Sequence, residues 1–488
     1  MIPVPLSRIA QWTGGQLHAH GREQDLLIDA VITDTRTFGN AAGDTESAAL
    51  FVALKGERFD GHRHVAEAAE LGVRAALVSE AQDVALPQIV VADTERALAS
   101  LAAALQHTRD ELVVAITGSN GKTTVKTLLL SILQRVGKTY ANPGNRNNEI
   151  GLPLSVIDAP ENSDFSIYEM GAGQPGDIAY LTAIVRPRVS LVNNIAPAHL
   201  ERLGSLEGVA DTKAAIYDAL PADGIAVINA DDAFASYFAA RARGRRQIRF
   251  ALDAEAEITA RDLRVADDRT QFRLITPQGE AEAVVPMAGR HNVANALAAA
   301  ALAYACETTL EDIVVGLRDV QPVAGRLMRY RLGNGAVLID DSYNANPGSL
   351  NAAIDTLASA SGETWLVLGD MRELGVDGQQ LHEAAGKRAK EAGIARLYAL
   401  GGLSAMAAKA FGEGAHTFST HEELTEALRS ELHATVRVLV KGSRGSAMDR
   451  IVKALLAADG GEPGRDGSSR GGPNKNGPNN KGNATHAA

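Results

Sequence analysis

The sequence is poor in cysteine, in aromatic residues and in long apolar runs. Cys306 is the single cysteine of the 488 residues, so neither an intramolecular disulfide nor a multi-cysteine metal site can form. Its alanine-rich, helical surroundings predict a small packed side chain rather than a nucleophile. Aromatic residues make up 4% of the chain, which argues against base stacking on exposed rings. No apolar run approaches the roughly 18 residues of a membrane span, and the amino terminus lacks the pattern of a signal peptide, so we expect a cytoplasmic protein without membrane insertion.

The charge balance is acidic. Asp and Glu together number 59 against 48 Lys and Arg, which gives a formal charge of −11. Nucleic acid and anionic membranes repel such a protein, so neither is an expected partner, although a local basic pocket for a phosphorylated substrate is compatible with this charge. No feature of the sequence demands an oligomer, and a monomer is expected.

Length and patterning divide the chain into four parts. A chain of 488 residues is too long for one hydrophobic core and suggests about three domains. Strand-like and helix-like runs alternate through residues 1–108, 109–323 and 324–459, which predicts three α/β domains. Residues 460–488 include eight glycines but no Val, Ile, Leu, Phe, Met, Tyr or Trp, so this tail is expected to be disordered.

The alternation of runs predicts parallel sheets covered by helices on both faces. The third domain has the pattern of a smaller, Rossmann-like doubly wound unit. Expected strands are residues 50–54 and 75–78 in the first domain, 112–116, 165–169, 189–193 and 225–229 in the second, and 336–340, 364–368, 397–400 and 436–440 in the third. Expected helices include residues 65–71, residues 94–106 and the apolar stripe from Val125 to Val136.

A glycine-rich loop between an expected strand and an expected helix is the strongest functional signal. The loop consists of Thr117, Gly118, Ser119, Asn120, Gly121, Lys122, Thr123 and Thr124. In such a loop backbone N–H groups surround a phosphate chain, while Lys122 reaches the β- and γ-phosphates and the Thr123 hydroxyl holds Mg²⁺. The general pattern has a glycine five residues before Gly121, where this chain has Ile116, so the loop is of a shorter form. The alternative is an incidental glycine turn, which the flanking strand and helix disfavour.

Several polar residues follow strands of the second domain. Glu169 ends an apolar strand, where a carboxylate is a good ligand for Mg²⁺, although a solvated strand-end acid is an equal alternative. His199 follows the strand at residues 189–193, and Lys213 lies on an expected helix. From the residues alone, His199 stays unassigned, and a surface lysine is the simpler interpretation of Lys213.

Polar residues also gather in the third domain and at one helix start. The segment from Asp340 to Pro347 follows a buried strand at the edge where ligands bind in such sheets, with a simple polar turn as the alternative. Asn292 either caps a helix or hydrogen-bonds a purine edge, and the local pattern favours the cap. The segment from Lys441 to Gly445 has the placement to bind a carboxylate or a phosphate.

Five of these segments occur in the order seen in the Mur ligase family, which the chain resembles. They are residues 117–124, 169–172, 198–201, 289–292 and 341–347. Three further segments, residues 51–62, 368–375 and 440–444, resemble the branch of that family that adds D-alanyl-D-alanine to UDP-N-acetylmuramoyl-tripeptide. The resemblance covers about residues 25–455 and leaves out the tail.

The resemblance implies ATP and Mg²⁺ as cofactors and assigns roles that the residues alone leave open. Lys122, Lys213 and His199 would be catalytic. The nucleotide would be bound by the loop at residues 117–124 and by Asn292, Arg326, Tyr343 and Asn346. The metal would be held by Thr123, Glu169, His199 and, once carbamylated, Lys213. The UDP-sugar would contact Thr33, Asp34, Thr35, Arg36, Lys55 and Gly56. The neighbouring Glu57 and Arg58 belong to the same expected contact segment. The family often has an acid two residues after the lysine, where this chain has Ala215.

The chemistry implied by the resemblance has two steps. The terminal carboxylate of the tripeptide attacks the γ-phosphate of ATP to give an acyl phosphate, and the amine of D-alanyl-D-alanine then displaces phosphate. Lys122 and Mg²⁺ would stabilise the charge of the transferred group, and the third domain would close to exclude water. The alternatives are a sister ligase, either the enzyme that makes the tripeptide or a folylpolyglutamate synthetase, and a nucleotide-dependent switch without a covalent product. Whether the third peptide residue is meso-diaminopimelate or lysine stays open.

Overall fold

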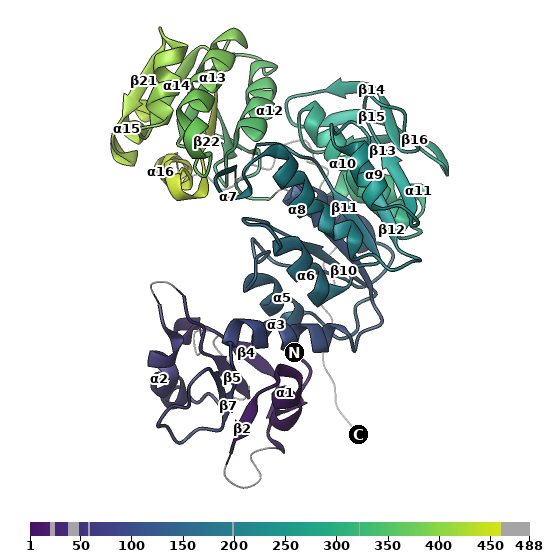
Figure 1. The fold of residues 1–488 in the computed structure, drawn as a ribbon. Helices are drawn as coiled ribbons and strands as arrows, with labels where there is room; N and C mark the ends of the chain where they lie inside the picture. The colour runs from purple at the N-terminus through teal and green to yellow at the C-terminus, as the bar shows by residue number, and fades with distance from the viewer. Residues whose placement is uncertain (20–24, 38–47, 57–58, 198–199, 322, 460–488) are drawn as a thin grey trace, which may run out of the picture.

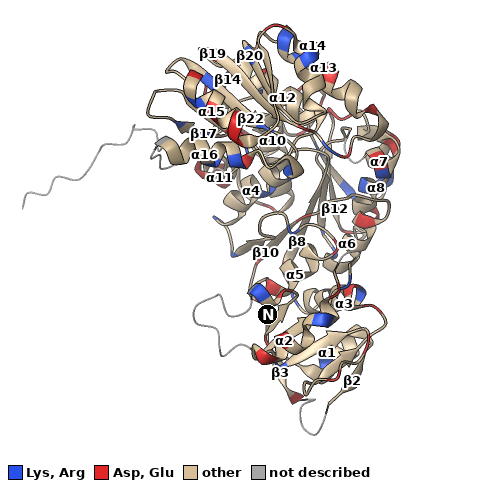
Figure 2. Ribbon diagram, turned by 90° about the vertical axis from the view of Figure 1, so that its left-hand side faces the viewer, with Lys and Arg blue, Asp and Glu red and all other residues tan. Residues whose placement is uncertain are grey.

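The computed structural model describes residues 1–19, 25–37, 48–56, 59–197, 200–321 and 323–459. Its α/β units follow one another along the molecule, with the N-terminal unit at one end, the central unit in the middle and the C-terminal unit at the other end (Figure 1). Acidic and basic residues are interspersed over these units (Figure 2). No helix of the described segments has the length and apolarity to cross a membrane. The predicted disordered tail at residues 460–488 lies outside the described residues.

The N-terminal unit is built on a five-stranded sheet of order β2-β7-β6-β5-β4, in which β2 is antiparallel to β7 and the other neighbours are parallel. Its elements are β1 (Val4–Pro5), α1 (Leu6–Thr13), β2 (Gln16–His18), β3 (Leu27–Ile28), β4 (Ala30–Ile32), β5 (Ala49–Val52), α2 (Val65–Glu70), β6 (Ala75–Val78), β7 (Gln88–Val90) and α3 (Thr94–Gln106). Asp93 caps α3 by accepting hydrogen bonds from two backbone N–H groups of its first turn. The buried apolar face of α3 joins this unit to the central one.

The central unit contains a six-stranded parallel sheet of order β13-β12-β11-β8-β10-β9. Its strands are β8 (Leu112–Thr117), β9 (Thr139–Ala141), β10 (Phe165–Glu169), β11 (Val189–Val192), β12 (Ile225–Asn229) and β13 (Arg246–Phe250). Its helices are α4 (Lys122–Leu133), α5 (Gly151–Asp158), α6 (Asp177–Val185), α7 (Leu200–Leu203), α8 (Leu206–Asp218), α9 (Ala235–Arg241), α10 (Arg290–Ala305) and α11 (Leu310–Asp319). Strand β8, the first in chain order, lies inside the sheet between β11 and β10, so the chain order turns back at β8, and ligands bind at such a point in open α/β sheets.

A three-stranded antiparallel sheet in the central unit was not predicted. It consists of β14 (Thr259–Val265), β15 (Thr270–Thr276) and β16 (Gly279–Val285). Buried and more exposed residues alternate along β15, the pattern of a strand with one face on the core. This sheet packs against α10 and α11.

The C-terminal unit is doubly wound, with the sheet order β17-β18-β22-β19-β20-β21. Only β17 is antiparallel to its neighbour in this sheet of the described chain. The strands are β17 (Met328–Arg331), β18 (Val337–Asp341), β19 (Glu363–Gly369), β20 (Arg396–Leu400), β21 (Ala415–Phe418) and β22 (Val436–Lys441). The helices are α12 (Pro347–Ala358), α13 (Gly378–Glu391), α14 (Ser404–Phe411), α15 (His421–Glu431) and α16 (Asp449–Asp459). The predicted Rossmann-like pattern is therefore confirmed.

Cys306 ends α10 as a buried side chain, as predicted. Burial raises the pKa of its thiol to about 12, so the nucleophilic thiolate is scarce at neutral pH. We expect the native protein to react with a thiol reagent such as DTNB at a small fraction of the rate seen in denaturant, where one thiol per chain reacts. Rapid reaction of the native protein would contradict the packing of this helix end.

Candidate active site

The phosphate loop has a shape that requires glycine at two positions. Gly118 and Gly121 have φ angles of 147° and 77°. A Cβ atom on Gly121 would lie 2.3 Å from Asn295 Oδ1, and one on Gly118 would lie 3.0 Å from Asn193 Cβ. Helix α4 begins at Lys122, so the unpaired N–H groups of its first turn face the loop. The result is an anion-binding helix start at the carboxyl end of β8.

Lys122 lies between two adjoining cavities and lines both. Its Nζ donates a hydrogen bond to the backbone oxygen of Gly118 over 2.7 Å. Burial lowers the pKa of Lys122, an effect that the carboxylate of Glu169 opposes and the charge of Arg326 reinforces. The side chain therefore places its Nζ at the junction of the two cavities.

Glu169 is the buried carboxylate of this junction. Its Oε1 accepts a hydrogen bond of 2.9 Å from Asn147 Nδ2, and the Lys126 ammonium lies 3.1 Å from its Oε2. Burial alone would raise the pKa of Glu169, but Lys126 and Lys122 together hold it below its ordinary value. Glu169 is therefore an anion that faces both cavities.

Hard oxygen donors at the junction fit Mg²⁺. Oε2 of Glu169 makes no hydrogen bond of good geometry within the described residues, although the Lys126 ammonium lies 3.1 Å away. The Thr123 hydroxyl belongs to the first turn of α4, and Thr123 lines the first cavity. The described residues contain no cluster of three His, Cys, Asp or Glu side chains arranged to hold a metal. Such a donor set suits Mg²⁺, which usually takes one or two protein oxygens and completes its shell with phosphates and water.

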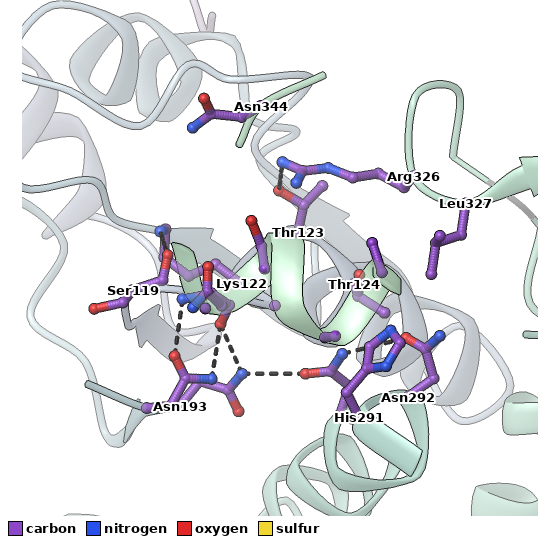
Figure 3. Close-up of a pocket in the computed structure, with 18 of the residues that line it drawn as sticks. Ser119, Lys122, Thr123, Thr124, Asn193, His291, Asn292, Arg326, Leu327 and Asn344 are labelled. Carbon is purple, nitrogen blue, oxygen red and sulfur yellow. Dashed lines mark hydrogen bonds between the residues drawn. The ribbon is translucent and has the colours of Figure 1, made fainter. Parts of the chain in front are cut away.

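The first cavity has a volume of 310 Å³ and extends from the phosphate loop to the start of α10 and the C-terminal unit. Lys122, Thr123, Asn292 and Arg326 surround it, as Figure 3 shows. Asn292 does not cap α10 as the local pattern suggested, because Gly289 occupies the N-cap position. Its Nδ2 instead donates to the backbone oxygen of Ala288 over 2.8 Å.

The second cavity has a volume of 340 Å³ and lies on the other side of Lys122. Its charged and amide-bearing lining includes Glu169, Asn147, Lys213, Arg202 and Arg444. Tyr343 also lines this cavity rather than the first one. The basic side chains of the lining are Lys122, Arg202, Lys213, Arg326 and Arg444, and its acids are Glu149, Glu169 and Asp177. Such a mixed lining with an excess of basic groups suits a ligand that carries carboxylates.

Lys213 projects into the second cavity from α8 and is 2% exposed. Burial lowers its pKa to about 7, with the charge of Lys122 adding to the effect and Asp177 opposing it. Within the described residues its Nζ has no ion pair or hydrogen bond. A large fraction of this amine is therefore neutral, and hence nucleophilic, near neutral pH.

The C-terminal unit reaches the phosphate loop through two side chains. Asn346 Nδ2 donates to Asn120 Oδ1 over 2.8 Å, while its Oδ1 caps α12 by accepting from Ser349 N. The Arg326 guanidinium lies 4.1 Å from the centre of the Tyr343 ring and reaches the Thr123 hydroxyl at 3.4 Å, as the dashed line in Figure 3 marks. Each of the two hydrogen bonds joins residues that are more than 200 positions apart in the sequence.

The structure brings together many, but not all, of the residues singled out in the sequence. Gathered at the two cavities are Ser119, Asn120, Gly121, Lys122, Thr123, Thr124, Glu169, Lys213, Asn292, Arg326, Tyr343 and Asn346, with Gly118 at the second cavity. Thr117 lies beneath the loop and donates to Met170 O. His199, Glu57 and Arg58 lie outside the described residues. The N-terminal group of Thr33, Asp34, Thr35, Arg36, Lys55 and Gly56 is not part of either cavity.

The sequence did not predict that Lys126, Asn147 and Asn193 contact residues of this site. Lys126 is a charged residue on the buried face of α4, between Val125 and Leu128, and that anomaly was a usable signal. Asn147 and Asn193 come from loops that no local pattern ties to the phosphate loop. Their contacts depend on the order of strands in the sheet.

Three family models match consecutive parts of the chain. They are described as the Mur ligase family catalytic domain at residues 44–109, the Mur ligase middle domain at 116–303 and the Mur ligase glutamate ligase domain at 325–444. The chain is 41% identical over 458 residues to the UDP-N-acetylmuramoyl-tripeptide–D-alanyl-D-alanine ligase of Escherichia coli K12, which covers 93% of this chain and 99% of that protein.

Solved structures agree with these matches. The crystal structure of MurF from Acinetobacter baumannii superimposes with a TM-score of 0.86 at 33% identity, over 93% of this chain and 99% of that one. The MurF ligase from Thermotoga maritima, crystallised in complex with ADP, superimposes with a TM-score of 0.76 at 26% identity, over 88% and 97% of the two chains. The three-domain arrangement is therefore shared along nearly the whole length of these proteins.

Proposed function

The chain belongs to the Mur ligase family, and from its site we infer that it joins D-alanyl-D-alanine to UDP-N-acetylmuramoyl-tripeptide in an ATP-dependent reaction. The observation that carries this inference is the position of Lys122 and Glu169 between two adjoining cavities. One cavity holds a phosphate loop, and the other has the cationic lining that a carboxylate substrate needs. The substrates are those named for the relative from E. coli, whose match covers 93% of this chain. The product is the UDP-N-acetylmuramoyl-pentapeptide precursor of peptidoglycan.

The nucleotide occupies the first cavity in this proposal. The loop at residues 117–124 surrounds its phosphates, with Lys122 on the terminal ones, and Arg326 faces the same group from the C-terminal unit. Asn292 is placed for the adenosine part, because its side chain lines the cavity at the start of α10. The Asn346 amide is already bonded to Asn120, which supports a role for Asn346 in holding the C-terminal unit on the loop.

Mg²⁺ would be held by Thr123, Glu169 and His199, and a second ion by Lys213 after carbamylation. When bound, the metal supplies positive charge that lowers the barrier to phosphoryl transfer. The lowered pKa of Lys213 supports the modification, since a carbamate forms from a neutral amine and carbon dioxide. Ala215 provides no acid near this lysine, so other groups would have to orient a carbamate.

Phosphoryl transfer begins with the tripeptide carboxylate in the second cavity. That carboxylate attacks the γ-phosphorus from the Lys213 side, ADP leaves, and an acyl phosphate remains. Lys122 lies at the boundary and stabilises the negative charge that gathers on the transferred group. The amine of D-alanyl-D-alanine then attacks the acyl carbon, loses a proton and expels phosphate. Contacts from the C-terminal unit through Arg326 and Asn346 enclose the site and restrict water.

The remaining assignments concern the outer parts of the molecule. We place the UDP-sugar on the N-terminal unit, near Thr33–Arg36 and Lys55–Gly56, and the dipeptide between the central and C-terminal units. The corresponding domains are residues 1–108, 109–323 and 324–459, followed by the tail. The enzyme would act in the cytoplasm, where UDP-linked cell-wall precursors are made. It would act as a monomer and would not need nucleic acid.

One product assay tests the proposed function. The protein is incubated with ATP, Mg²⁺, D-alanyl-D-alanine and UDP-N-acetylmuramoyl-tripeptide carrying either meso-diaminopimelate or lysine, and products are identified by mass. A pentapeptide formed with one ADP per bond is expected. Extension of a UDP-linked dipeptide by one amino acid would favour the sister ligase, and glutamate addition to folate would favour folylpolyglutamate synthetase. ATP turnover without any peptide product would favour the switch.

A variant of Asn346 tests how the C-terminal unit is held on the phosphate loop. Asn346→Ser keeps an oxygen that caps α12 but removes the amide that donates to Asn120. Loss of one net hydrogen bond of about 1 kcal/mol should weaken ADP binding roughly fivefold. Fluorescence titration with a labelled ADP measures the affinity, and circular dichroism checks that helix content is unchanged. Wild-type affinity would show that the Asn120 contact does not contribute to nucleotide retention.

A further inference from the structure

A buried lysine with no part in the proposed chemistry lies under the junction of the two cavities. Lys126 is one turn into α4, and its side chain is 7% exposed. It is not among the lining residues of either cavity. A lysine is rarely buried unless several partners satisfy its charge and its three N–H groups.

Lys126 has partners on two segments. Its Nζ lies 3.1 Å from Glu169 Oε2, and it donates hydrogen bonds to the backbone oxygens of Asn142 over 2.8 Å and Gly144 over 3.2 Å. The ammonium therefore connects α4 to the end of β10 and to the start of the loop that follows β9.

That loop belongs to the second cavity. Residues 142–149 form a turn whose later members, Asn145, Asn147, Asn148 and Glu149, line the cavity. Asn142 holds the backbone of Glu169 from both sides, accepting from its N–H over 2.8 Å and donating to its carbonyl over 3.0 Å. Asn147 donates to the Glu169 carboxylate over 2.9 Å. The loop and Glu169 are thus one hydrogen-bonded unit.

We propose that Lys126 is a positioning residue that fixes this unit to the helix of the phosphate loop. Its three contacts keep two groups at a constant geometry relative to Lys122. These are the Glu169 carboxylate and the loop at residues 142–149, which would face the UDP-linked tripeptide. A displacement of about 1 Å between reacting groups can slow a reaction by roughly 10²-fold, so a tether at this point matters to catalysis. Where it concerns the UDP-linked tripeptide, the proposal rests on the function proposed above. A lysine that only neutralised Glu169 would change the charge at the proposed metal site but would leave the loop at residues 142–149 in place.

Kinetics show whether turnover of the UDP-linked tripeptide depends on Lys126. Lys126→Met keeps the length of the side chain but removes its charge and its donors, Lys126→Arg keeps the charge, and Lys138→Met alters an exposed lysine as a matched control. For Lys126→Met we expect kcat/KM for the UDP-linked tripeptide to fall roughly 10²-fold. Binding of a fluorescent ADP in EDTA should stay at the wild-type level, because Lys126 does not line the nucleotide cavity. Lys126→Arg should recover part of the loss, and Lys138→Met should match wild type.

Hydrogen exchange measures the tether without any catalytic readout. The backbone N–H groups of Asn142, Arg146 and Asn147 donate to Ile167 O, Pro143 O and Asn145 O. In Lys126→Met these amides should exchange faster than in wild type, while those of the last turn of α4 should not. If that variant is too unstable, Lys126→Met with Glu169→Gln removes both buried charges together and should show the same loosening of the loop.

Two results would overturn the proposal. One is unchanged exchange over residues 142–147 in the folded variant or double variant. The other is an equal loss of acceptor turnover and metal-free ADP binding, which would indicate a general structural defect. A wild-type protein that made no pentapeptide would refute the proposed function instead, while the exchange measurement would still decide whether Lys126 holds the loop.

Discussion

Replacing Lys122 by alanine is expected to lower the rate of ATP-dependent peptide formation by at least about 10³-fold. Lys122 is one of two basic residues, with Arg326, that line both cavities, and phosphoryl transfer depends on positive charge placed against the transferred group. Single-turnover kinetics with saturating substrates measure the effect on the chemical step. The fold should survive, because the side chain bonds only to loop carbonyls of Gly118 and Ser119 within the described chain.

The control for this variant is Lys138→Met, which removes an exposed lysine near the far end of α4. It should retain wild-type activity, and both proteins should unfold at similar temperatures. Full activity of Lys122→Ala would refute the assignment of residues 117–124 as the catalytic phosphate loop.

Lys213→Ala is expected to lose roughly 10²- to 10³-fold in kcat, and added formate or acetate should restore part of it. The proposed carbamate places a carboxylate-like group in the second cavity, and loss of one such electrostatic contact has effects of this size. Truncation leaves space in a buried position, where a small carboxylate can take the place of the carbamate. The measurement is the dependence of kcat on the concentration of the added acid.

A matched variant distinguishes this rescue from a general effect of salt. Lys213→Met fills most of the space that the lysine occupies, so small acids should not restore its activity. Chloride at the same ionic strength should have no effect on Lys213→Ala. Equal rescue of both variants, or no loss of activity in either, would contradict the modification of Lys213.

The sequence predicted elements best where a local signal marks both ends. The strands at residues 165–169 and 225–229 and the helix at 94–106 have the expected bounds. Each strand is an apolar run ended by a polar residue, and the helix starts at the Asp93 cap. Elements with mixed composition were missed, such as β13, which contains Arg246, Gln247 and Arg249. The antiparallel strands β14 to β16 carry many charged residues on their exposed face and lack continuous apolar runs.

The candidate site was predictable as far as chain neighbours and strand ends define it. Lys122 and Thr123 belong to one loop, and Glu169 ends the strand beside it, so sheet geometry alone brings them together. The burial of Lys213 could not be derived locally, because it depends on how α8 packs against α6 and β11. The bond between Asn120 and Asn346 depends on how two domains sit together, which no local pattern encodes.

The transfer of oxygen from substrate to phosphate tests the central claim most directly. The tripeptide is prepared with ¹⁸O in both oxygens of its terminal carboxylate, and the inorganic phosphate formed with ATP and D-alanyl-D-alanine is analysed by mass spectrometry. If the carboxylate attacks the γ-phosphorus and the amine then expels phosphate, each phosphate carries one ¹⁸O atom and the new amide keeps the other. Unlabelled phosphate, or label found in AMP, would contradict an acyl-phosphate ligase built around this loop.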